Sequence, residues 1–242
     1  MTRYILIATL AIAPAVAQPV RTAPRHVSRV VPGCGDPKAG CSSATLDYVE
    51  VISGPAQARE RINAAILAYL VEDKKLTPLQ YADDFNKQYQ PVSDAQQWDL
   101  IENVAVLRAA PPVFSVECYR EEYVGGAHPL HETKYLNFDA ATGDPVKLAS
   151  ILKDGSMPAL TAIAEKYFRK EKELGPTDDL SGFTFPHGHF ELNDNYGIGD
   201  KSLLFCFNEY EIDSYMSGPT RLEIPYSEIR GLLRPDFAAR AK

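Results

Sequence analysis

The residues whose types and spacing best suit chemistry lie in one short segment, Tyr123-Val-Gly-Gly-Ala-His-Pro129. Gly125 and Gly126 permit backbone angles and close approaches that are closed to other residues. Pro129 restricts His128 to an extended conformation, so the imidazole is held by a stiff segment. The segment either presents His128 to a ligand or forms a tight connection in which the imidazole bonds neighbouring backbone, and the residues alone favour the second interpretation.

Two histidine pairs have a spacing that suits metal binding. Imidazoles from both pairs, supplemented by a carboxylate, are ligands that Zn²⁺ and Cu²⁺ accept. However, Pro129 keeps the first pair off a helix, and no HExxH motif frames either pair. The sequence therefore predicts no metal site and no cofactor, and the residues of this rejected site are His128, His131, His187, His189, Asp139 and Glu191.

Nucleophilic catalysis has less support. The chain has no G-x-S-x-G elbow and no phosphate-cradling glycine loop. A glycosidase needs two carboxyl groups facing each other across a cleft, which sequence does not reveal. The acidic residues near expected strand ends are Glu121, Glu122, Glu209, Glu211 and Asp213.

Three tyrosines, Tyr210, Tyr215 and Tyr226, lie in and near the segment FNEYEIDSYMSGP. Tyrosines beside the Gly218-Pro219 turn suit a recognition surface, because they bury a large area at low entropic cost. They equally suit the edge of a core. The candidate ligand-binding residues are Tyr123, Gly125, Gly126, His128, Tyr210 and Tyr215, and none is expected to be catalytic.

The N-terminus has the three parts of a secretory signal: Arg3, an uncharged apolar run from Tyr4 to Val16, and the A-x-A site ending at Ala17. The run is too short to span a bilayer. We expect cleavage after Ala17 and a periplasmic or secreted protein without a membrane span.

Charge excludes some partners. The chain has 25 basic and 32 acidic residues, a net charge of −7, and loss of Arg3 leaves 24 against 32, or −8. An acidic protein is a poor candidate for nucleic acid or an anionic membrane surface.

Four cysteines in an oxidising compartment predict two disulfides. Cys34 and Cys41 lie close together in a loop, which leaves Cys118 to pair with Cys206. The spacings contain no C-x-x-C, which argues against a four-cysteine zinc site.

Around these residues the hydrophobic pattern predicts an α+β fold with a largely antiparallel sheet packed against helices. A proline-containing flexible leader is expected over 18–45 and a strand over 46–52. Two helices follow, the second capped by Thr77 with Pro78 in its first turn. Strands are expected over 99–109, 113–124, 135–139 and 201–212, and helices over 158–171 and 226–233. We expect an N-terminal part over 46–97, a C-terminal domain over 98–235 and a tail over 236–242.

Four segments in this order, YVGGAHP, YLNFDAATGDPVKLASIL, LLFCFNEYEIDSYMSGP and IPYSEIRGLL, resemble a bacterial domain-of-unknown-function family. This domain forms the C-terminal extracytoplasmic part of a lysozyme-sensing anti-sigma factor and accompanies the catalytic domain of a peptidoglycan deacetylase. The resemblance covers roughly 98–235. The matching positions are Tyr123, Gly125, Gly126, His128, Asp139, Gly143, Tyr210, Tyr215, Gly218 and Pro225.

The resemblance implies a non-catalytic accessory or sensing role. The expected function is therefore an exported cell-envelope module that binds a lysozyme-like protein or a peptidoglycan fragment. The alternative is a cell-wall hydrolase, metal-dependent or not, that uses His128 and His131. A purely structural or assembly role also stays open.

Overall fold

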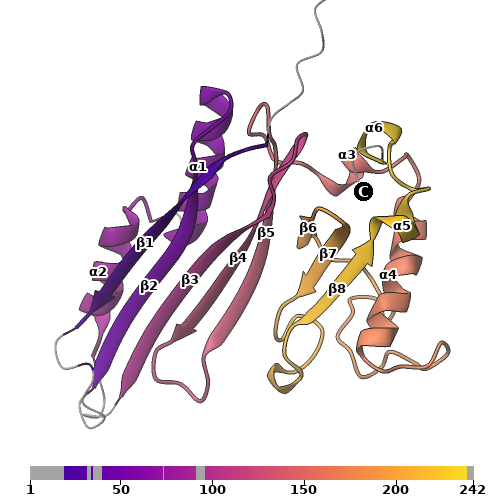
Figure 1. The fold of residues 1–242 in the computed structure, drawn as a ribbon. Coiled ribbons are helices and arrows are strands. Elements are labelled where there is room, and N and C mark those ends of the chain that lie inside the picture. Colours follow the sequence, from indigo (N-terminus) through magenta and orange to yellow (C-terminus); the bar gives the residue numbers. More distant parts are fainter. Residues whose placement is uncertain (1–18, 32–33, 35–39, 73, 91–95, 239–242) are drawn as a thin grey trace, which may run out of the picture.

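The computed structural model describes residues 19–31, 34, 40–72, 74–90 and 96–238. The described part contains a five-stranded and a three-stranded sheet with helices on their outer sides (Figure 1). All strand pairs but one are antiparallel, which confirms the predicted α+β class. None of the helices in these ranges is both long and apolar enough to cross a membrane. The expected signal peptide lies outside the described residues.

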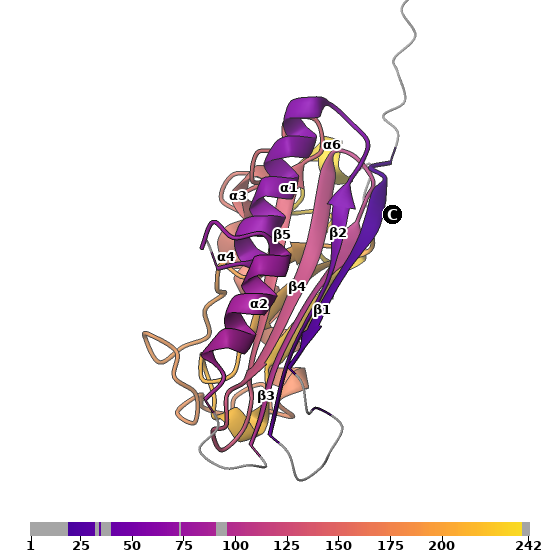
Figure 2. The same cartoon turned by 90° about the vertical axis from the view of Figure 1, so that its left-hand side faces the viewer.

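The first sheet has the order β1-β2-β3-β4-β5. Its strands are β1 (Thr22–Val30), β2 (Cys41–Val51), β3 (Gln97–Arg108), β4 (Val113–Tyr123) and β5 (Leu130–Asp139). β2 and β3 are parallel, so the chain between them must cross over, and it does so through α1 (Ala56–Leu70) and α2 (Pro78–Gln88). Both helices lie against one face of the sheet (Figure 2).

The N-terminal leader expected over 18–45 is wrong, because β1 pairs along its whole length with β2. The hydrophobic alternation of β1 is weak, because it is an edge strand whose side chains are all exposed or half-buried. The capping prediction at α2 is confirmed. The Thr77 hydroxyl accepts a hydrogen bond from the Gln80 N–H, and the Gln80 side chain accepts one from the Thr77 N–H.

The second sheet is β6 (Tyr196–Ile198), β7 (Ser202–Phe207) and β8 (Thr220–Pro225), with β7 in the centre. α4 (Met157–Glu171) packs on it, together with the short helices α3 (Leu148–Ile151), α5 (Tyr226–Ile229) and α6 (Pro235–Ala238). The strand expected over 201–212 ends at Phe207, and the helix expected over 226–233 ends at Ile229. The expected tail is partly structured, because Phe237 is buried against Tyr226.

Each sheet has its own hydrophobic core. One core lies between the five-stranded sheet and helices α1 and α2, and the other surrounds α4 and the three-stranded sheet. β3, β4 and β5 belong with the N-terminal strands, so the division expected between residues 97 and 98 runs through a single sheet.

Asparagine side chains join the two sheets along the free edge of β5. Asn195 accepts a hydrogen bond from the Tyr135 N–H at 3.0 Å and donates to the Thr133 carbonyl at 2.7 Å. Asn208 accepts from the Thr133 N–H at 2.8 Å. Asn137 on β5 donates to the Tyr196 carbonyl at 2.7 Å and accepts from the Ile198 N–H at 2.9 Å. These amides satisfy the backbone groups that an edge strand leaves unpaired.

Candidate functional site

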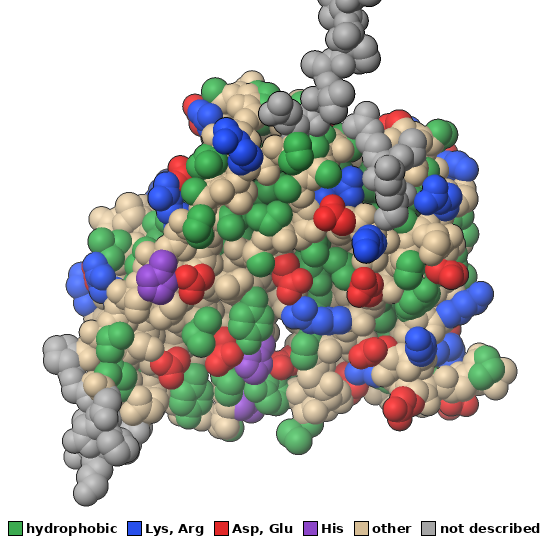
Figure 3. Space-filling view, viewed as in Figure 1, with side chains coloured by type: hydrophobic (Ala, Val, Ile, Leu, Met, Phe, Trp, Pro, Cys, Tyr) green, Lys and Arg blue, Asp and Glu red, His purple; other side chains and the backbone are tan. Residues whose placement is uncertain are grey.

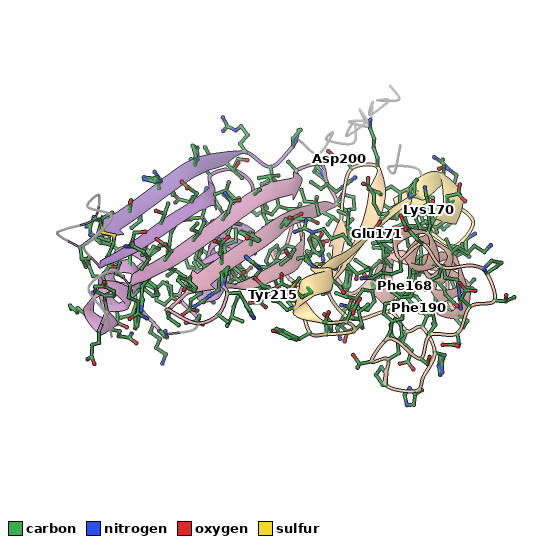
Figure 4. All side chains as sticks on the ribbon, turned by 90° about the horizontal axis from the view of Figure 1, so that it is seen from below. Phe168, Lys170, Glu171, Phe190, Asp200 and Tyr215 are labelled. Atoms are coloured by element: carbon green, nitrogen blue, oxygen red, sulfur yellow. A yellow bond between two sulfur atoms is a disulfide. The ribbon has the colours of Figure 1, made fainter. Side chains whose placement is uncertain are left out.

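Two loops meet below the junction of the sheets. The first joins β4 to β5 and contains His128, and the second runs from Asn208 to Pro219 between β7 and β8. The asparagine contacts at Thr133 hold the start of the second loop beside β5. Figure 4 shows Tyr215, from the second loop, at the junction of the two parts.

Four aromatic rings form a near-parallel column across these loops. Tyr119 on β4 stacks with His131 on β5 at a centroid distance of 6.3 Å, and His131 lies 6.1 Å from Tyr215. Tyr215 stacks on His128 at 3.5 Å, and the Tyr210 hydroxyl lies 3.2 Å from Nε2 of His128. Of the predicted site residues, His128, Tyr210 and Tyr215 therefore converge. We call these four rings, together with that of Tyr210, the aromatic column.

His131 is flanked by two carboxylates. Its Nδ1 lies 2.9 Å from Oε1 of Glu209, and its Nε2 lies 3.6 Å from Oε2 of Glu121. Glu209 is almost fully buried, whereas the side chain of His131 remains 25% exposed. Tyr119 donates its hydroxyl to Glu121 at 2.8 Å, and burial together with this bond raises the pKa of Tyr119 to about 12.

A hollow of about 240 Å³ opens beside His131. Arg221 on β8 lies at its wall and ties the sheets together, donating to Glu117 on β4 at 3.0 Å and to the Thr133 hydroxyl at 2.9 Å. The lining residues are Tyr119, His131, Thr133, Asn208, Glu209, Pro219 and Arg221.

A larger cleft of about 750 Å³ lies on the other side of Arg221, between β5, β7, β8 and the end of α4. Figure 3 shows acidic and basic side chains mixed in the middle of the face turned to the viewer, between the two halves of the molecule. We call the cleft of about 750 Å³ the mixed-charge cleft. It is lined by Leu107, Glu117, Tyr135, Tyr167, Lys170, Glu171, Gly199, Asp200, Lys201, Ser202, Leu204, Arg221, Leu222 and Glu223.

Some charges in the mixed-charge cleft are already matched. Arg221 pairs with Glu117, and Ser202 donates to Glu223 at 2.8 Å. Lys170, Glu171 and Lys201 make no ion pair with any described residue, so they are free to meet a ligand. Figure 4 labels Lys170 and Glu171 at the end of α4, with Asp200 across from them.

Another hollow, of about 510 Å³, lies near Pro111, Pro112 and the start of α1. Its wall is mostly proline, alanine and glycine. Its one carboxylate, Asp139, already accepts hydrogen bonds from the N–H groups of Ala141 and Thr142. Its other polar side chains are those of Arg21 and Ser53, so it carries fewer polar groups than the other two hollows.

The remaining predicted site residues lie elsewhere or have a structural role. Tyr123 donates its hydroxyl to the Gly126 carbonyl at 3.0 Å, and Gly125 has a positive φ of 87°, so these residues shape the His128 loop. Tyr226 is buried in the C-terminal core and donates to the Gly199 carbonyl. Among the described residues, the group with metal-ligand spacing consists of His187, His189 and Glu191, and it does not include His128, His131 or Asp139.

The disulfide between Cys34 and Cys41 is confirmed. The predicted bridge between Cys118 and Cys206 is wrong, because both are buried free thiols. Cys118 points into the core beneath α1 and α2, whereas Cys206 lies on β7 in the other sheet. Burial raises the pKa of both thiols, that of Cys206 to about 11, which disfavours the reactive thiolate form.

Tyr119, Arg221 and the asparagines were not singled out by sequence reasoning. Period two places Tyr119 on the face of β4 away from the helices, together with Glu117 and Glu121. Nothing in the local pattern signals that a second sheet approaches that face.

The overall fold occurs in two solved structures. The chain has a TM-score of 0.72 to a DUF3298 family member from Bacteroides fragilis NCTC 9343, with 18% identity, covering 92% of this chain and 97% of that one. A DUF3298 family protein from Pseudomonas aeruginosa PAO1 gives 0.70, also with 18% identity, over 91% and 97% of the two chains.

Residues 149–227 match the family described as "Protein of unknown function (DUF3298)". This segment is therefore similar to a DUF3298 domain, which confirms the predicted resemblance to a family of unknown function. The matched segment is shorter than the expected 98–235.

One relative has a named activity. The chain is 26% identical over 108 residues to a Mycobacterium tuberculosis (strain ATCC 25618 / H37Rv) protein named "Esterase Rv3036c". The match covers 44% of this chain and 46% of that protein, so the chain spans about half the length of the curated relative.

Proposed function

We propose that the protein is a non-catalytic binding module for a peptidoglycan fragment, which lies along the junction of the two sheets. The observation that carries this proposal is the arrangement of two hollows on either side of Arg221, one walled by aromatic rings and the other by free charges of both signs. Their concave shape favours a small fragment over a protein surface.

The two hollows match the two chemical parts of such a fragment. Sugar rings stack on exposed aromatic side chains, and Tyr210 of the aromatic column is 59% exposed. A stem peptide carries carboxylates, which suit Lys170 and Lys201, and ammonium groups, which suit Glu171. The volume of about 750 Å³ lies within the usual range of ligand pockets, roughly 300–1,000 Å³.

The hydrogen bonds of the two histidines support binding rather than acyl transfer. Within the described residues, His128 contacts the Pro129 carbonyl and the Tyr210 hydroxyl, and His131 contacts Glu209 and Glu121. Neither imidazole has a serine, threonine or cysteine partner there, so no nucleophile is paired with a base.

The test is calorimetric titration of the protein with a purified disaccharide–tetrapeptide fragment of peptidoglycan. We expect saturable binding by the wild type and at least tenfold weaker binding by Tyr215→Ala, which removes the central ring of the column. Tyr48→Ala, on β2 and outside both hollows, is the matched control and should bind like the wild type.

Three outcomes would count against the proposal: no binding to the fragment, equal binding by the wild type and Tyr215→Ala, or saturable binding to c-type lysozyme alone. The last outcome would point instead to the protein ligand, which the acidic charge of the chain would attract through salt-sensitive steering.

The proposal also requires export. The expected signal peptide predicts that the protein recovered from outside the cytoplasm begins at Gln18. N-terminal sequencing tests this, and an intact start at Met1 would remove the protein from the compartment of its proposed ligand.

A second candidate function is hydrolysis of a carboxylic ester, favoured by the Glu121–His131–Glu209 arrangement and by the relative named as an esterase. In this reaction His131 takes a proton from water as the water oxygen attacks the ester carbonyl. The proton then passes to the departing alkoxide, which leaves an acid and an alcohol.

Hydrolysis of p-nitrophenyl butyrate separates this candidate from simple binding. We expect His131→Ala to lower the rate at least a hundredfold if His131 is the base, whereas His26→Ala, at an exposed histidine on β1, leaves it unchanged. Equal rates in the wild type and His131→Ala would remove this candidate.

A further inference from the structure

We propose that His187, His189 and Glu191 form a surface site for a divalent transition-metal ion of the zinc class. This site is separate from the aromatic column and the mixed-charge cleft, and it does not depend on the proposed function. The described residues contain no other group of three or more histidine, cysteine or acidic side chains that gathers its ligand atoms in this way.

A short turn holds the three side chains. The Gly188 N–H donates to the Phe185 carbonyl at 3.1 Å, and Gly188 has a positive φ of 73°, which favours glycine. This turn places His187 and His189 on either side of the glycine with their rings stacked at 5.7 Å.

Buried phenylalanines fix both ends of the turn. Phe185 and Phe190 are almost fully buried, and both pack on Phe168 of α4, at centroid distances of 5.3 and 5.1 Å. Figure 4 labels Phe168 and Phe190 side by side in the C-terminal part. The two histidines therefore project from a loop whose base is part of the core.

The ligand atoms of the three side chains already lie close to one another, and one of the distances between them matches that in a tetrahedral metal site. One oxygen of Glu191 contacts Nδ1 of His187 and lies 3.3 Å from Nε2 of His189, and the three ligand atoms lie within 4.8 Å of one another. Two ligands of a tetrahedral Zn²⁺, each about 2.05 Å from the ion, are about 3.3 Å apart. Small side-chain rotations are enough to bring all three atoms onto one ion.

The donor set selects the class of metal. Two imidazoles and one carboxylate suit Zn²⁺, Cu²⁺ or Ni²⁺, whereas Mg²⁺ and Ca²⁺ prefer oxygen ligands. The side chains of His187 and His189 are 69% and 68% exposed. Water therefore completes the coordination, and we expect a micromolar, exchangeable site.

The experiment is calorimetric titration of untagged wild-type protein with ZnCl₂ in a non-chelating buffer, with MgCl₂ as the control ion. We expect one Zn²⁺ per chain and no Mg²⁺ binding. His189→Ala and Glu191→Gln should each weaken Zn²⁺ binding at least tenfold. His26→Ala is the matched control, because His26 is an exposed histidine paired with a carboxylate, Asp47, and has no second histidine ligand.

The proposal is overturned if the wild type shows no saturable Zn²⁺ binding, or if His189→Ala and Glu191→Gln bind as tightly as the wild type. An equal loss in His26→Ala would also overturn it, by showing scattered surface binding. A second readout guards against a misfolded variant: Zn²⁺ should raise the Tm of the wild type but leave that of His189→Ala unchanged.

Discussion

The carboxamide of Asn208 pairs with both backbone groups of Thr133, accepting from its N–H at 2.8 Å and donating to its carbonyl at 3.1 Å. A side chain here takes the place of a neighbouring strand. Glu209 follows directly in the chain and reaches His131, two residues before Thr133. The backbone of β5 therefore sets the position of the loop that supplies two of the five rings of the aromatic column.

Replacing Asn208 should affect both stability and the site. We expect Asn208→Ala to lower the free energy of unfolding by about 2 kcal/mol, because the Thr133 N–H loses its partner and the Thr133 carbonyl keeps only its bond from Asn195. It should also weaken fragment binding, since Glu209 and Tyr210 are no longer held. Urea unfolding measures the first effect and calorimetry the second.

Asn103→Ala is the control for Asn208→Ala, because Asn103 is an exposed asparagine on β3. It should change neither quantity. If Asn208→Ala unfolded at the same urea concentration as Asn103→Ala, the amide would not be the link between the sheets.

Glu102 on β3 gives the protein a pH-dependent stability. Its side chain is fully buried, both carboxylate oxygens lack a hydrogen-bond partner, and Arg120 lies 3.4 Å away. Burial raises the pKa of Glu102 from 4.5 to about 8, against the opposing effect of the Arg120 guanidinium. The folded state therefore keeps a proton that the unfolded state releases above its ordinary pKa.

The direction of the pH dependence follows from the difference in proton binding between the folded and unfolded states. The contribution of protonated Glu102 is fully present below pH 4.5 and is lost as the pH rises through about 8. We expect Glu102→Gln, which cannot ionise, to be more stable than the wild type at pH 8.5 by about 2–4 kcal/mol, and the advantage to shrink towards pH 5. Glu60→Gln, at an exposed position of α1, should show no such pH dependence. An advantage of Glu102→Gln that stays constant with pH would contradict this account.

Gly143 is a position where a methyl group has no room. Its φ is 75°, and a Cβ there would lie 2.6 Å from the carbonyl oxygen of Ala58 at the start of α1. Gly155 has the same φ but open space around it. We expect Gly155→Ala to cost about 1 kcal/mol from backbone strain alone and Gly143→Ala about 1–3 kcal/mol more, from the clash. Thermal unfolding of the two variants measures the difference, and equal Tm values would mean that the turn moves away freely.

The free thiols of Cys118 and Cys206 should be unreactive in the folded protein. Cys118 and Cys206 are fully buried and their pKa values are raised, so we expect no reaction with a disulfide reagent in native buffer. Two thiols per chain should react once urea unfolds the protein. Reaction of either thiol at the native rate of an exposed cysteine would place it outside the core described above.

Much of the fold could be predicted from local pattern. The capping box at Thr77, the helical period of α1 and α4 and the alternation in β3 and β4 are consistent with the structure, since each depends on neighbouring residues. β1 was missed because its proline, Pro24, and its exposed side chains resemble those of a loop. The false prediction of a Cys118–Cys206 disulfide has another cause. Two cysteines can form a disulfide only if their side chains face each other, and an even number of cysteines does not show which side chains do so.

The site was half predictable. His128, Tyr210 and Tyr215 stand in distinctive segments and do converge. Tyr119 and Arg221 come from ordinary strand positions, and their role appears only when β8 approaches β4. The Glu209–His131 contact joins residues 78 apart in sequence, and no local period encodes it.

The asparagine contacts along β5 also bear on how this chain can be divided. The segment that matches the DUF3298 family, residues 149–227, carries Asn195 and Asn208 but not the strand they bond. If this segment were expressed alone, the side-chain amides of Asn195 and Asn208 would lose the β5 backbone groups that they bond. The remaining five-stranded sheet would have an unpaired edge at β5, which favours self-association. The boundary of the recognisable sequence family is thus not a boundary of folding, and the unit to express, evolve or transplant is the whole pair of sheets.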